Sequence, residues 1–305
     1  MVNAIETQDL SKRFGRTRAV DGLTLAVPAG SIFAFLGANG AGKTTTIKML
    51  MDIVHPSSGT ATVLGVDSRR LGPGERAQIG YVSENQSLPG WMTAATFLRF
   101  CRGFYPTWDE SLAERLSRSF ALPPDTRLRD LSRGMKMKAA LLSSIAYRPR
   151  LLVLDEPFTG LDVLVREELV RGMLELAEND GWTVFVSSHD IDEVERLADW
   201  VGILSAGRLQ LAEPSAALQA RMRRVEVTAP EGMLSAEAPA SWLGFERAGQ
   251  RVTFVESEYR EGATEAAVRA HFGGAGEITI SPLSLRESFA VLARAYDLAG
   301  GKEAA

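Results

Sequence analysis

The sequence predicts an α/β fold with a phosphate-binding loop at the edge of a buried parallel sheet. An apolar run at 32–36 has no polar alternation, which is typical of a strand covered on both faces. A glycine-rich segment, 37–45, follows it and leads into a helical pattern of apolar residues at 47–54. A second fully apolar strand, 151–154, ends at an acidic pair. Strand, glycine-rich turn and helix in this order are the context in which the pattern G-x-x-x-x-G-K-[ST] binds phosphate.

The glycine-rich loop has the residue types that a phosphate site needs. Its three glycines, Gly37, Gly40 and Gly42, let the backbone wrap close to an anion, so that consecutive N–H groups converge on phosphate oxygens. The following helix adds the partial positive charge of its N-terminus. We expect Lys43 to reach the β- and γ-phosphates of a nucleotide and the Thr44 hydroxyl to bind Mg²⁺. The alternative is a loop whose glycines only make a turn.

Length and composition limit the classes of function. The chain has 305 residues, enough for one large core and a smaller domain. Its net charge of −4 gives no electrostatic reason to expect nucleic acid as a main partner. Cys101 is the only cysteine, which excludes an intrachain disulfide and favours a reducing compartment. The N-terminus lacks the pattern of a signal peptide, and no apolar run approaches roughly 18 residues, so we expect any membrane role to come through a partner.

The segments around the loop are expected to add short strands and then a block of helices. Residues 4–30 have the pattern of short strands with polar turns. Phe14 stands beside a glycine in this segment, where it could either stack on a nucleotide base or fill the core. Further strands are expected at 60–64 and 79–83. The apolar spacing then becomes helical, which predicts an inserted helical subdomain at about 88–147.

Charged side chains follow two of the predicted strands. Asp155 and Glu156 stand where the apolar strand leaves the carboxyl edge of the sheet, a position suited to Mg²⁺ binding and general base work. A solvated strand end is the alternative. A helix is expected at 164–179, followed by a strand at 183–187 with His189 at its tip. A lone histidine is usually structural, but beside a γ-phosphate it becomes a candidate polar sensor.

The last third of the chain differs in composition. Residues 191–198 are expected to form a helix, and Glu213-Pro214 marks the boundary between domains at 1–214 and 215–305. The second domain is predicted to be a small α/β accessory domain with no motif of its own. Its expected elements are alternating runs at 225–227, 251–255 and 278–280 and a final helix at 285–298, with a separating stretch at 229–250. Apolar residues at helical spacing in that final helix could stabilise a dimer or pack internally.

Two further motifs, Leu131-Ser132-Arg133-Gly134-Met135 and Thr159-Gly160-Leu161-Asp162, complete a recognisable set. Together with the phosphate loop, the acidic pair and the histidine, they resemble the motifs of an ATP-binding cassette (ABC) ATPase. The resemblance covers roughly residues 4–213 and keeps the order of that family's motifs. It implies a P-loop NTPase fold of ABC type, with an antiparallel β subdomain and an inserted helical subdomain.

The resemblance also implies a role for each matching residue. Asp155 matches the aspartate that supports Mg²⁺, Glu156 the catalytic base that polarises the attacking water, and His189 the switch histidine at the γ-phosphate. Phe14 matches the aromatic residue that stacks on adenine, and Asp162 a loop that communicates across a dimer. The residues matching the Walker A loop, and expected to bind ATP, are Gly37, Asn39, Gly40, Ala41, Gly42, Lys43, Thr44 and Thr45.

The implied assembly contains two cassettes. Ser132 and Gly134 match the signature that completes the nucleotide site of the opposite subunit, so two ATP molecules would lie between head-to-tail cassettes. The second cassette would be another copy or a paralogous ATPase subunit. A separate integral membrane permease would be the other partner, which implies a cytoplasmic protein held peripherally at the inner face of the cell membrane.

Three positions depart from the usual pattern of the family. Arg133 replaces a glycine and Met135 the glutamine of the LSGGQ signature. Glu84 stands where the family has a glutamine; a carboxylate there can still ligate Mg²⁺ but adds negative charge beside the triphosphate, and Gln86 is the rival for the role. With the segment 104–109, these substitutions resemble the bacterial branch that couples to ABC-2-type permeases, mostly exporters.

Two other functions compete with transport. A non-transport ABC ATPase acting on nucleic acid or ribosomes is disfavoured because the chain has one cassette, no sustained heptads before the signature and an acidic balance. An ordinary phosphate-loop kinase does not account for the signature or for the Asp162 loop. ATP hydrolysis that drives a separate permease of the export type is therefore the leading hypothesis.

Overall fold

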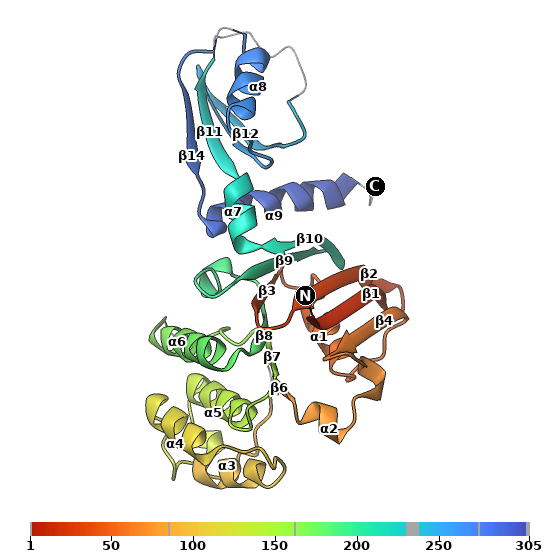
Figure 1. Cartoon of the computed structure of the whole chain (residues 1–305), viewed down its shortest axis with the longest axis vertical. Coiled ribbons are helices and arrows are strands. Elements are labelled where there is room, and N and C mark those ends of the chain that lie inside the picture. The colour runs from red at the N-terminus through yellow and green to blue at the C-terminus, as the bar shows by residue number, and fades with distance from the viewer. Residues whose placement is uncertain (1, 85, 162, 230–237, 274, 303–305) are drawn as a thin grey trace. The chain divides into compact units, whose positions relative to one another are not determined.

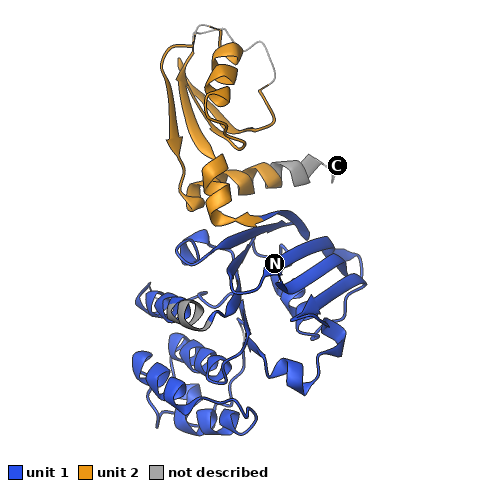
Figure 2. Cartoon of the chain, in the orientation of Figure 1, with its two compact units in different colours: residues 1–212 blue, residues 213–305 orange. Residues whose placement is uncertain are grey.

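The computed structural model describes residues 2–84, 86–161, 163–229, 238–273 and 275–302, with only the backbone for 175–180 and 297–302. The chain divides into two compact units, Met1–Ala212 and Glu213–Ala305 (Figure 2). Among the described residues, no helix combines the length and the apolar character that a membrane crossing requires.

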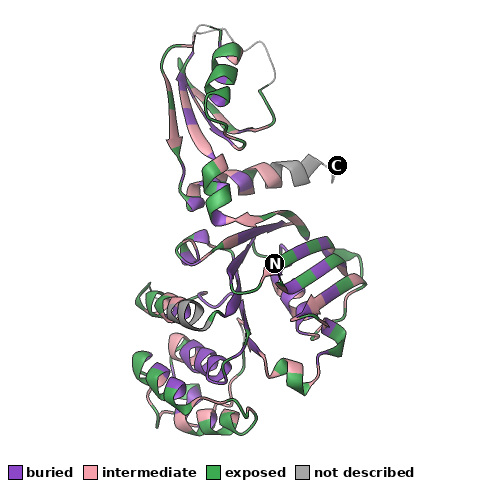
Figure 3. Cartoon of the chain, viewed as in Figure 1, coloured by how far each residue is buried: buried purple, intermediate pink, exposed green. Residues whose placement is uncertain are grey.

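The first unit is organised around a six-stranded sheet with the order β10-β9-β3-β8-β7-β6. The central strands β3 and β7 are buried along their whole lengths, as their unbroken apolar runs predict (Figure 3). The pairings β3–β8, β3–β9, β7–β8 and β6–β7 are parallel, so the carboxyl ends of these strands meet at one edge. The strands are β3 (Ile32–Leu36), β6 (Ile79–Val82), β7 (Leu151–Asp155), β8 (Thr183–Ser188), β9 (Trp200–Ser205) and β10 (Arg208–Pro214).

A second sheet of the first unit is antiparallel, as expected, and has the order β2-β1-β4-β5. Its first two strands are longer than the predicted short ones, with 12 residues each. Burial alternates along β2 and follows a less regular pattern along β1, where the register shifts. The buried residues place one face of this sheet on the core that also contains Phe33 and Phe185. The strands are β1 (Asn3–Phe14), β2 (Thr17–Pro28), β4 (Ser58–Val63) and β5 (Val66–Asp67).

The helices of the first unit include the inserted block. Between β6 and β7 the chain forms α3 (Ala94–Arg102), α4 (Glu110–Ser119) and α5 (Arg133–Ile145), which cluster beside the β6 edge of the sheet (Figure 1). Asp109 caps α4 and Ser132 caps α5, each accepting a backbone N–H three residues on. The others are α1 (Lys43–Leu50), α2 (Pro73–Arg76) and α6 (Val163–Asp180), with short 3₁₀ turns η1 (Ser68–Arg70) and η2 (Leu128–Asp130).

The prediction of a helix at 191–198 is wrong. Only a 3₁₀ turn, η3 (Ile191–Glu193), forms there, and turns follow it. The reason is local competition for hydrogen bonds: the Asp190 carboxylate accepts from the backbone of Asp192, and the Glu193 side chain folds inward to Ser188.

The second unit is an α/β arrangement with a four-stranded antiparallel sheet of order β12-β13-β11-β14. Trp242, Phe254 and Phe272 stack in its core. The stretch expected only to separate strands contributes β12, and α8 was not predicted. In the final helix Leu292 is 3% exposed, which favours internal packing of its apolar face. The elements are α7 (Ser215–Arg221), β11 (Arg223–Thr228), β12 (Trp242–Ala248), β13 (Arg251–Glu256), α8 (Ala263–His271), β14 (Ile278–Pro282) and α9 (Leu285–Lys302).

Candidate functional site

The predicted site residues come together at the carboxyl edge of the six-stranded sheet. The glycine-rich loop leaves β3 there, Asp155 ends β7, and His189 follows the last residue of β8. The strand register holds these ends level, because Asp155 lies opposite Ser187 and Leu36 lies opposite Ser188. This edge of a parallel sheet is where open α/β folds bind their ligands.

Two glycines of the loop occupy positions that exclude a side chain. A Cβ on Gly37 would lie 2.4 Å from the Leu204 carbonyl oxygen. A Cβ on Gly42, whose φ is +107°, would lie 2.4 Å from the Ala19 carbonyl oxygen. Gly42 also begins α1, so the loop ends directly at a helix N-terminus. Because the backbone of the loop lies so close to the neighbouring strands at these two glycines, the course of the loop is fixed. Its N–H groups then lead into the N-terminus of the helix.

Lys43 is held inside the loop that it follows. It is only 5% exposed, and its Nζ donates to the carbonyl oxygens of Gly37 at 2.6 Å and Ala38 at 3.2 Å. The same ammonium group lies 3.1 Å from Glu156 Oε1. A buried cation is therefore centred between the phosphate loop and the carboxylate at the end of β7.

Thr44, Asp155 and Ser187 form a hydroxyl–carboxylate group beside this cation. Asp155 Oδ1 accepts from Thr44 Oγ1 at 3.0 Å and from Ser187 Oγ at 2.9 Å. Burial raises the pKa of the Asp155 carboxyl, and the two hydroxyl donors oppose that shift only in part. Sequence reasoning missed Ser187, although a polar residue inside an apolar strand was a usable signal.

The oxygen donors of this group fit Mg²⁺, which takes hard oxygen ligands. No cluster of three or more histidine, cysteine or acidic side chains able to hold a metal occurs among the described residues. At nucleotide sites Mg²⁺ is bound by one or two protein oxygens together with substrate phosphates and waters, and Thr44 and Asp155 offer oxygens of this kind.

Glu156 connects Lys43 with His189. Its Oε2 lies 2.7 Å from His189 Nδ1 and accepts from Thr159 Oγ1 at 3.2 Å. Burial works to raise the pKa of the Glu156 carboxyl, but the His189 hydrogen bond and the Lys43 charge outweigh it, and the pKa is lowered. The backbone of Glu156 has φ +51°, an uncommon left-handed conformation for a non-glycine residue. Strain of this kind clusters at functional sites.

Glu84 and Gln86, the two candidates for one role, have different surroundings. Glu84 Oε1 lies 3.9 Å from Arg133 Nη2, and the negative charge of Glu84 contributes to the raised pKa of Asp155. Gln86 instead turns back toward β6, where its Oε1 accepts from the Ser83 N–H at 3.3 Å. Because the charge of Glu84 acts on Asp155 and Gln86 turns away, Glu84 is the better candidate for a residue near the expected Mg²⁺ position.

The remaining predicted residues that the structure describes take no part in the contacts given above. Phe14, at the end of β1, is 52% exposed, with Lys12 Nζ 5.0 Å from its ring centroid, so it does not fill the core. Ser132 accepts from the Met135 N–H, and a Cβ on Gly134 would lie 3.3 Å from the side chain of Val165. Asn39 and Gly40 are exposed on the loop, Ala41 is buried, and Thr45 is half-buried. Asp162 lies outside the described residues.

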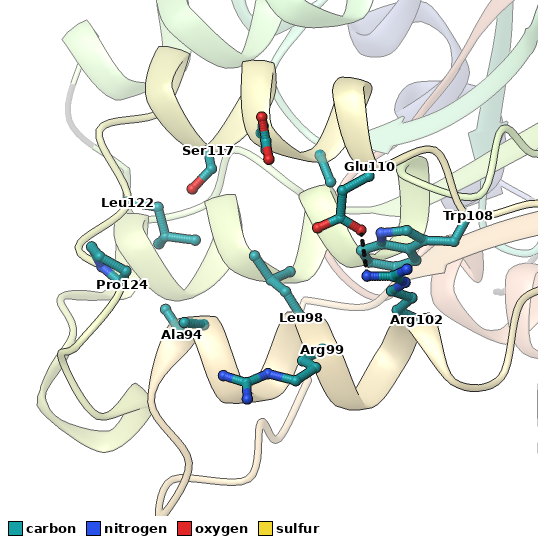
Figure 4. A pocket seen from close by; sticks show the side chains of 12 residues that line it. Ala94, Leu98, Arg99, Arg102, Trp108, Glu110, Ser117, Leu122 and Pro124 are labelled. Atoms are coloured by element: carbon teal, nitrogen blue, oxygen red, sulfur yellow. Dashed lines mark ion pairs between the residues drawn. The ribbon is translucent and has the colours of Figure 1, made fainter.

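Two cavities of the first unit are separate from this cluster. One, of about 310 Å³, lies between α3 and α4, where Arg102 and Glu110 form an ion pair beside Trp108 (Figure 4). None of the predicted site residues that the structure describes lines it. The other, of about 340 Å³, is a groove that we call the β6–α3 groove; its lining includes Leu71, Tyr81, Gln86, Leu88, Phe97, Cys101, Tyr105 and Tyr147.

Comparison with known proteins gives a consistent match. The family model for ABC transporters matches residues 20–159. The bacitracin transport ATP-binding protein BcrA of Enterococcus faecalis is 31% identical over 240 residues, which is 78% of each chain. The daunorubicin/doxorubicin resistance ATP-binding protein DrrA of Streptomyces peucetius is 37% identical over 68% of this chain and 64% of its own length.

This chain matches only part of a longer relative. The probable multidrug ABC transporter ATP-binding protein YbhF of Escherichia coli is 38% identical over 67% of this chain, but the match spans only 36% of YbhF.

Solved structures of ABC transporter cassettes have the same fold as the first unit. An ATP-binding subunit of an ABC transporter superposes with a TM-score of 0.65 at 29% identity, covering 71% of this chain and 92% of its own. The ATP-binding cassette MJ0796, solved as a dimer bound to ADP and Pi, has a TM-score of 0.62 at 21% identity, covers 69% of this chain and 98% of its own, and supports the fold.

Proposed function

The chain belongs to the family of ABC transporter ATP-binding proteins, and we propose from this premise that it hydrolyses ATP to drive a separate membrane permease, as an exporter subunit. The observation that supports hydrolysis best is the continuous set of contacts Lys43–Glu156–His189 at the mouth of the phosphate loop. The names of BcrA (bacitracin transport) and DrrA (daunorubicin/doxorubicin resistance) support the export role.

Glu156 is the proposed general base for the attack of water on the γ-phosphate. Its lowered pKa keeps the carboxylate ionised at neutral pH, so that it can accept a hydrogen bond from the attacking water. Lys43 and His189, now in contact with this carboxylate, are the groups proposed to face the γ-phosphate and offset its charge. The loop N–H groups and the α1 N-terminus would hold the β-phosphate.

Mg²⁺ is proposed to bind at Thr44 and Asp155, with Glu84 near by. When bound there, the ion would neutralise charge on the transferring phosphoryl group. The contribution of the chain is the pair of hydrogen bonds from Thr44 and Ser187, which fixes one oxygen of the Asp155 carboxylate in place.

The proposed active form is a dimer of cassettes. Ser132 and Gly134 stand at the start of α5, outside the network of contacts around Lys43, so the serine–glycine tip is available to the nucleotide of a second cassette. Asp162 is proposed to take part in the same interface. We propose that residues 215–305 form a separate accessory domain.

The permease is proposed to dock in the β6–α3 groove through an amphipathic helix. The groove is lined mainly by apolar and aromatic side chains, including Phe97 and Cys101 of α3. The exposed ring of Phe100 lies on the same helix, and the exposed ring of Phe104 follows just after the helix ends. Gln86, in the loop that also carries Glu84, lines the groove, so an occupant would contact the loop that leads to the metal side of the site. This docking would hold the protein at the inner face of the cell membrane.

Two measurements test the proposal. Glu156→Gln should retain ATP binding and lose turnover by about 10²- to 10⁴-fold, the usual contribution of a general base. Turnover at the wild-type rate would contradict the base assignment. Solubilised membranes should yield the chain together with a polytopic subunit, whereas recovery in a stoichiometric soluble complex without such a subunit would contradict transport.

A further inference from the structure

Glu193 is a buried carboxylate that the proposed chemistry does not use. It ends η3 and is only 5% exposed. Its Oε2 accepts from Ser188 Oγ at 2.5 Å, and its Oε1 lies 3.4 Å from Arg166 Nη2. Removing a carboxylate from water is costly, so a buried one has to be held by partners of this kind. The cost indicates that Glu193 contributes more than packing.

Ser188 links Glu193 to both sides of the nucleotide site. It is fully buried at the end of β8, immediately before His189. Its carbonyl oxygen accepts from the Gly37 N–H at 3.3 Å, at the start of the phosphate loop. Its hydroxyl accepts from the Asp190 N–H at 3.0 Å, so it holds the backbone on the far side of His189 as well. The hydrogen bond from Ser188 to Glu193 therefore helps to fix where the imidazole of His189 stands.

Arg166 connects Glu193 to helix α6. It lies in the first turn of α6, which begins directly after Asp162 in the sequence. Its side chain is 28% exposed, and among the described residues its buried Nε has no hydrogen-bond partner. The ion pair to Glu193 thus joins the start of α6 to the end of β8.

We propose that Glu193 is a positioning residue for His189, acting through Ser188, and that its ion pair with Arg166 transmits the position of α6 to that histidine. This inference rests on the proposed ATPase function. A displacement of the first turn of α6 would reach His189 through two side-chain contacts, Arg166–Glu193 and Glu193–Ser188. A misplacement of about 1 Å in a catalytic group can cost on the order of a hundredfold in rate.

Three substitutions separate the parts of this connection. Glu193→Gln keeps an oxygen that can accept from Ser188 but removes the charge that faces Arg166. Ser188→Ala removes the hydroxyl and leaves the ion pair. Arg166→Gln removes the ion pair from the other side. Arg196→Gln is the matched control, because Arg196 is exposed and lines the same cavity of about 610 Å³ as Arg166 and Glu193.

Steady-state ATPase kinetics give the first readout. Each of the three variants should lower kcat by roughly tenfold and leave KM for ATP within about twofold, because His189 acts on the reacting phosphate. The double variant Glu193→Gln/Arg166→Gln should lose no more than either single variant. Arg196→Gln should match the wild type. Losses that multiply in the double variant, or an unchanged kcat in all three, would overturn the inference.

Histidine NMR gives a second readout that does not depend on activity. The chain has three histidines, and His189→Gln assigns the resonance of His189. In Glu193→Gln and Ser188→Ala, the His189 ring resonances should shift while those of His55 and His271 stay in place. An unshifted His189 resonance in folded variants of reduced kcat would overturn the positioning role. Failure of the proposed function looks different, because wild-type protein would then show no turnover that depends on Glu156.

Discussion

Arg133 Nη2 lies 3.9 Å from Glu84 Oε1, so two positions at which this chain departs from the usual ABC motifs face each other within one subunit. Arg133 also occupies the space beside Gly160, where a Cβ would lie 2.8 Å from its Nη1. The long side chain that replaces a signature glycine is thereby placed between the loop after β6 and the loop after β7. Glu84 adds negative charge near Asp155, and because the Arg133 guanidinium lies beside Glu84, we expect it to offset part of that charge.

Removing the Arg133 charge should therefore strengthen metal binding. We expect Arg133→Gln to lower the Mg²⁺ concentration for half-maximal turnover by about two- to fivefold, and Glu84→Gln to raise it by a similar factor. Both side chains are partly exposed, so these effects are modest and shrink at high salt. Mg²⁺ titrations of ATPase activity at low and high ionic strength measure them. Arg129→Gln, which removes a comparably exposed arginine, is the control; an Arg133→Gln titration that coincides with it would contradict the pairing.

Phe14 should contribute to nucleotide affinity and little to stability. Because its ring is 52% exposed, Phe14→Ala creates no cavity in the core. Loss of an aromatic stacking contact of about 0.5–1.5 kcal/mol should raise the Kd for ATP roughly two- to tenfold. Phe100→Ala provides a phenylalanine of equal exposure outside the site. Fluorescence titration with a labelled ATP analogue measures both, and equal affinities would exclude stacking by Phe14.

Asp155→Asn should make the folded protein more stable at neutral pH while abolishing Mg²⁺-dependent turnover. The folded-state pKa of Asp155 is raised, so its charged form costs stability above that pKa, and the cost disappears as the pH falls through it. Asparagine can accept the same hydroxyl hydrogen bonds without the charge. The expected gain in Tm is a few degrees, the shift that roughly 1 kcal/mol gives in a domain of this size. Thermal unfolding without metal measures the difference in Tm between Asp155→Asn and the wild type at pH 7 and near pH 4. This difference should shrink toward pH 4; a difference that grows there would contradict the raised pKa.

The thiol of Cys101 should react slowly in the folded protein. Burial raises its pKa to about 11, so about one thiol in a thousand is ionised at pH 8. In the unfolded chain the pKa returns to about 8.5, and alkylation should be on the order of a hundredfold faster. The folded-state rate should rise about tenfold per pH unit between pH 8 and 10. Mass spectrometry after timed iodoacetamide treatment measures the rates; a folded thiol that reacts as fast as the unfolded one would exclude burial in the β6–α3 groove.

The parts of the site that depend on local pattern were predictable from the sequence. The phosphate loop is defined by Gly37, Gly42 and Lys43 within ten residues, and the acidic pair Asp155–Glu156 stands at the end of an unmistakably buried strand. The meeting of these ends followed from the parallel sheet, because parallel strands bring their carboxyl ends to one edge. Membership of the ABC family and its fold, inferred from the joint set of motifs, are confirmed by the comparisons.

What escaped prediction leaves little trace in the hydrophobic pattern. The inward turn of Glu193, which replaces the expected helix, arises from hydrogen bonds to the nearby Ser188 and Asp190 and from the ion pair with the distant Arg166. Strand β12 pairs with β13 across a bulge after Leu243, and its alternation is interrupted by Gly244. The helix α8 has few buried apolar residues, Val268 among them, and thus a weak periodic signal. The left-handed backbone of Glu156 and the approach of Arg133 to Glu84 have no counterpart in any local pattern.

Sedimentation of the Glu156→Gln variant tests the two-half nucleotide site most directly. With Mg-ATP the variant should sediment as a dimer, because it binds nucleotide without consuming it, and with ADP as a monomer. The same variant with the additional substitution Ser132→Arg should stay monomeric while it still binds ATP, because the larger side chain at position 132 would block the approach of the second cassette. A Glu156→Gln protein that is saturated with Mg-ATP and remains monomeric at every concentration would contradict the shared site.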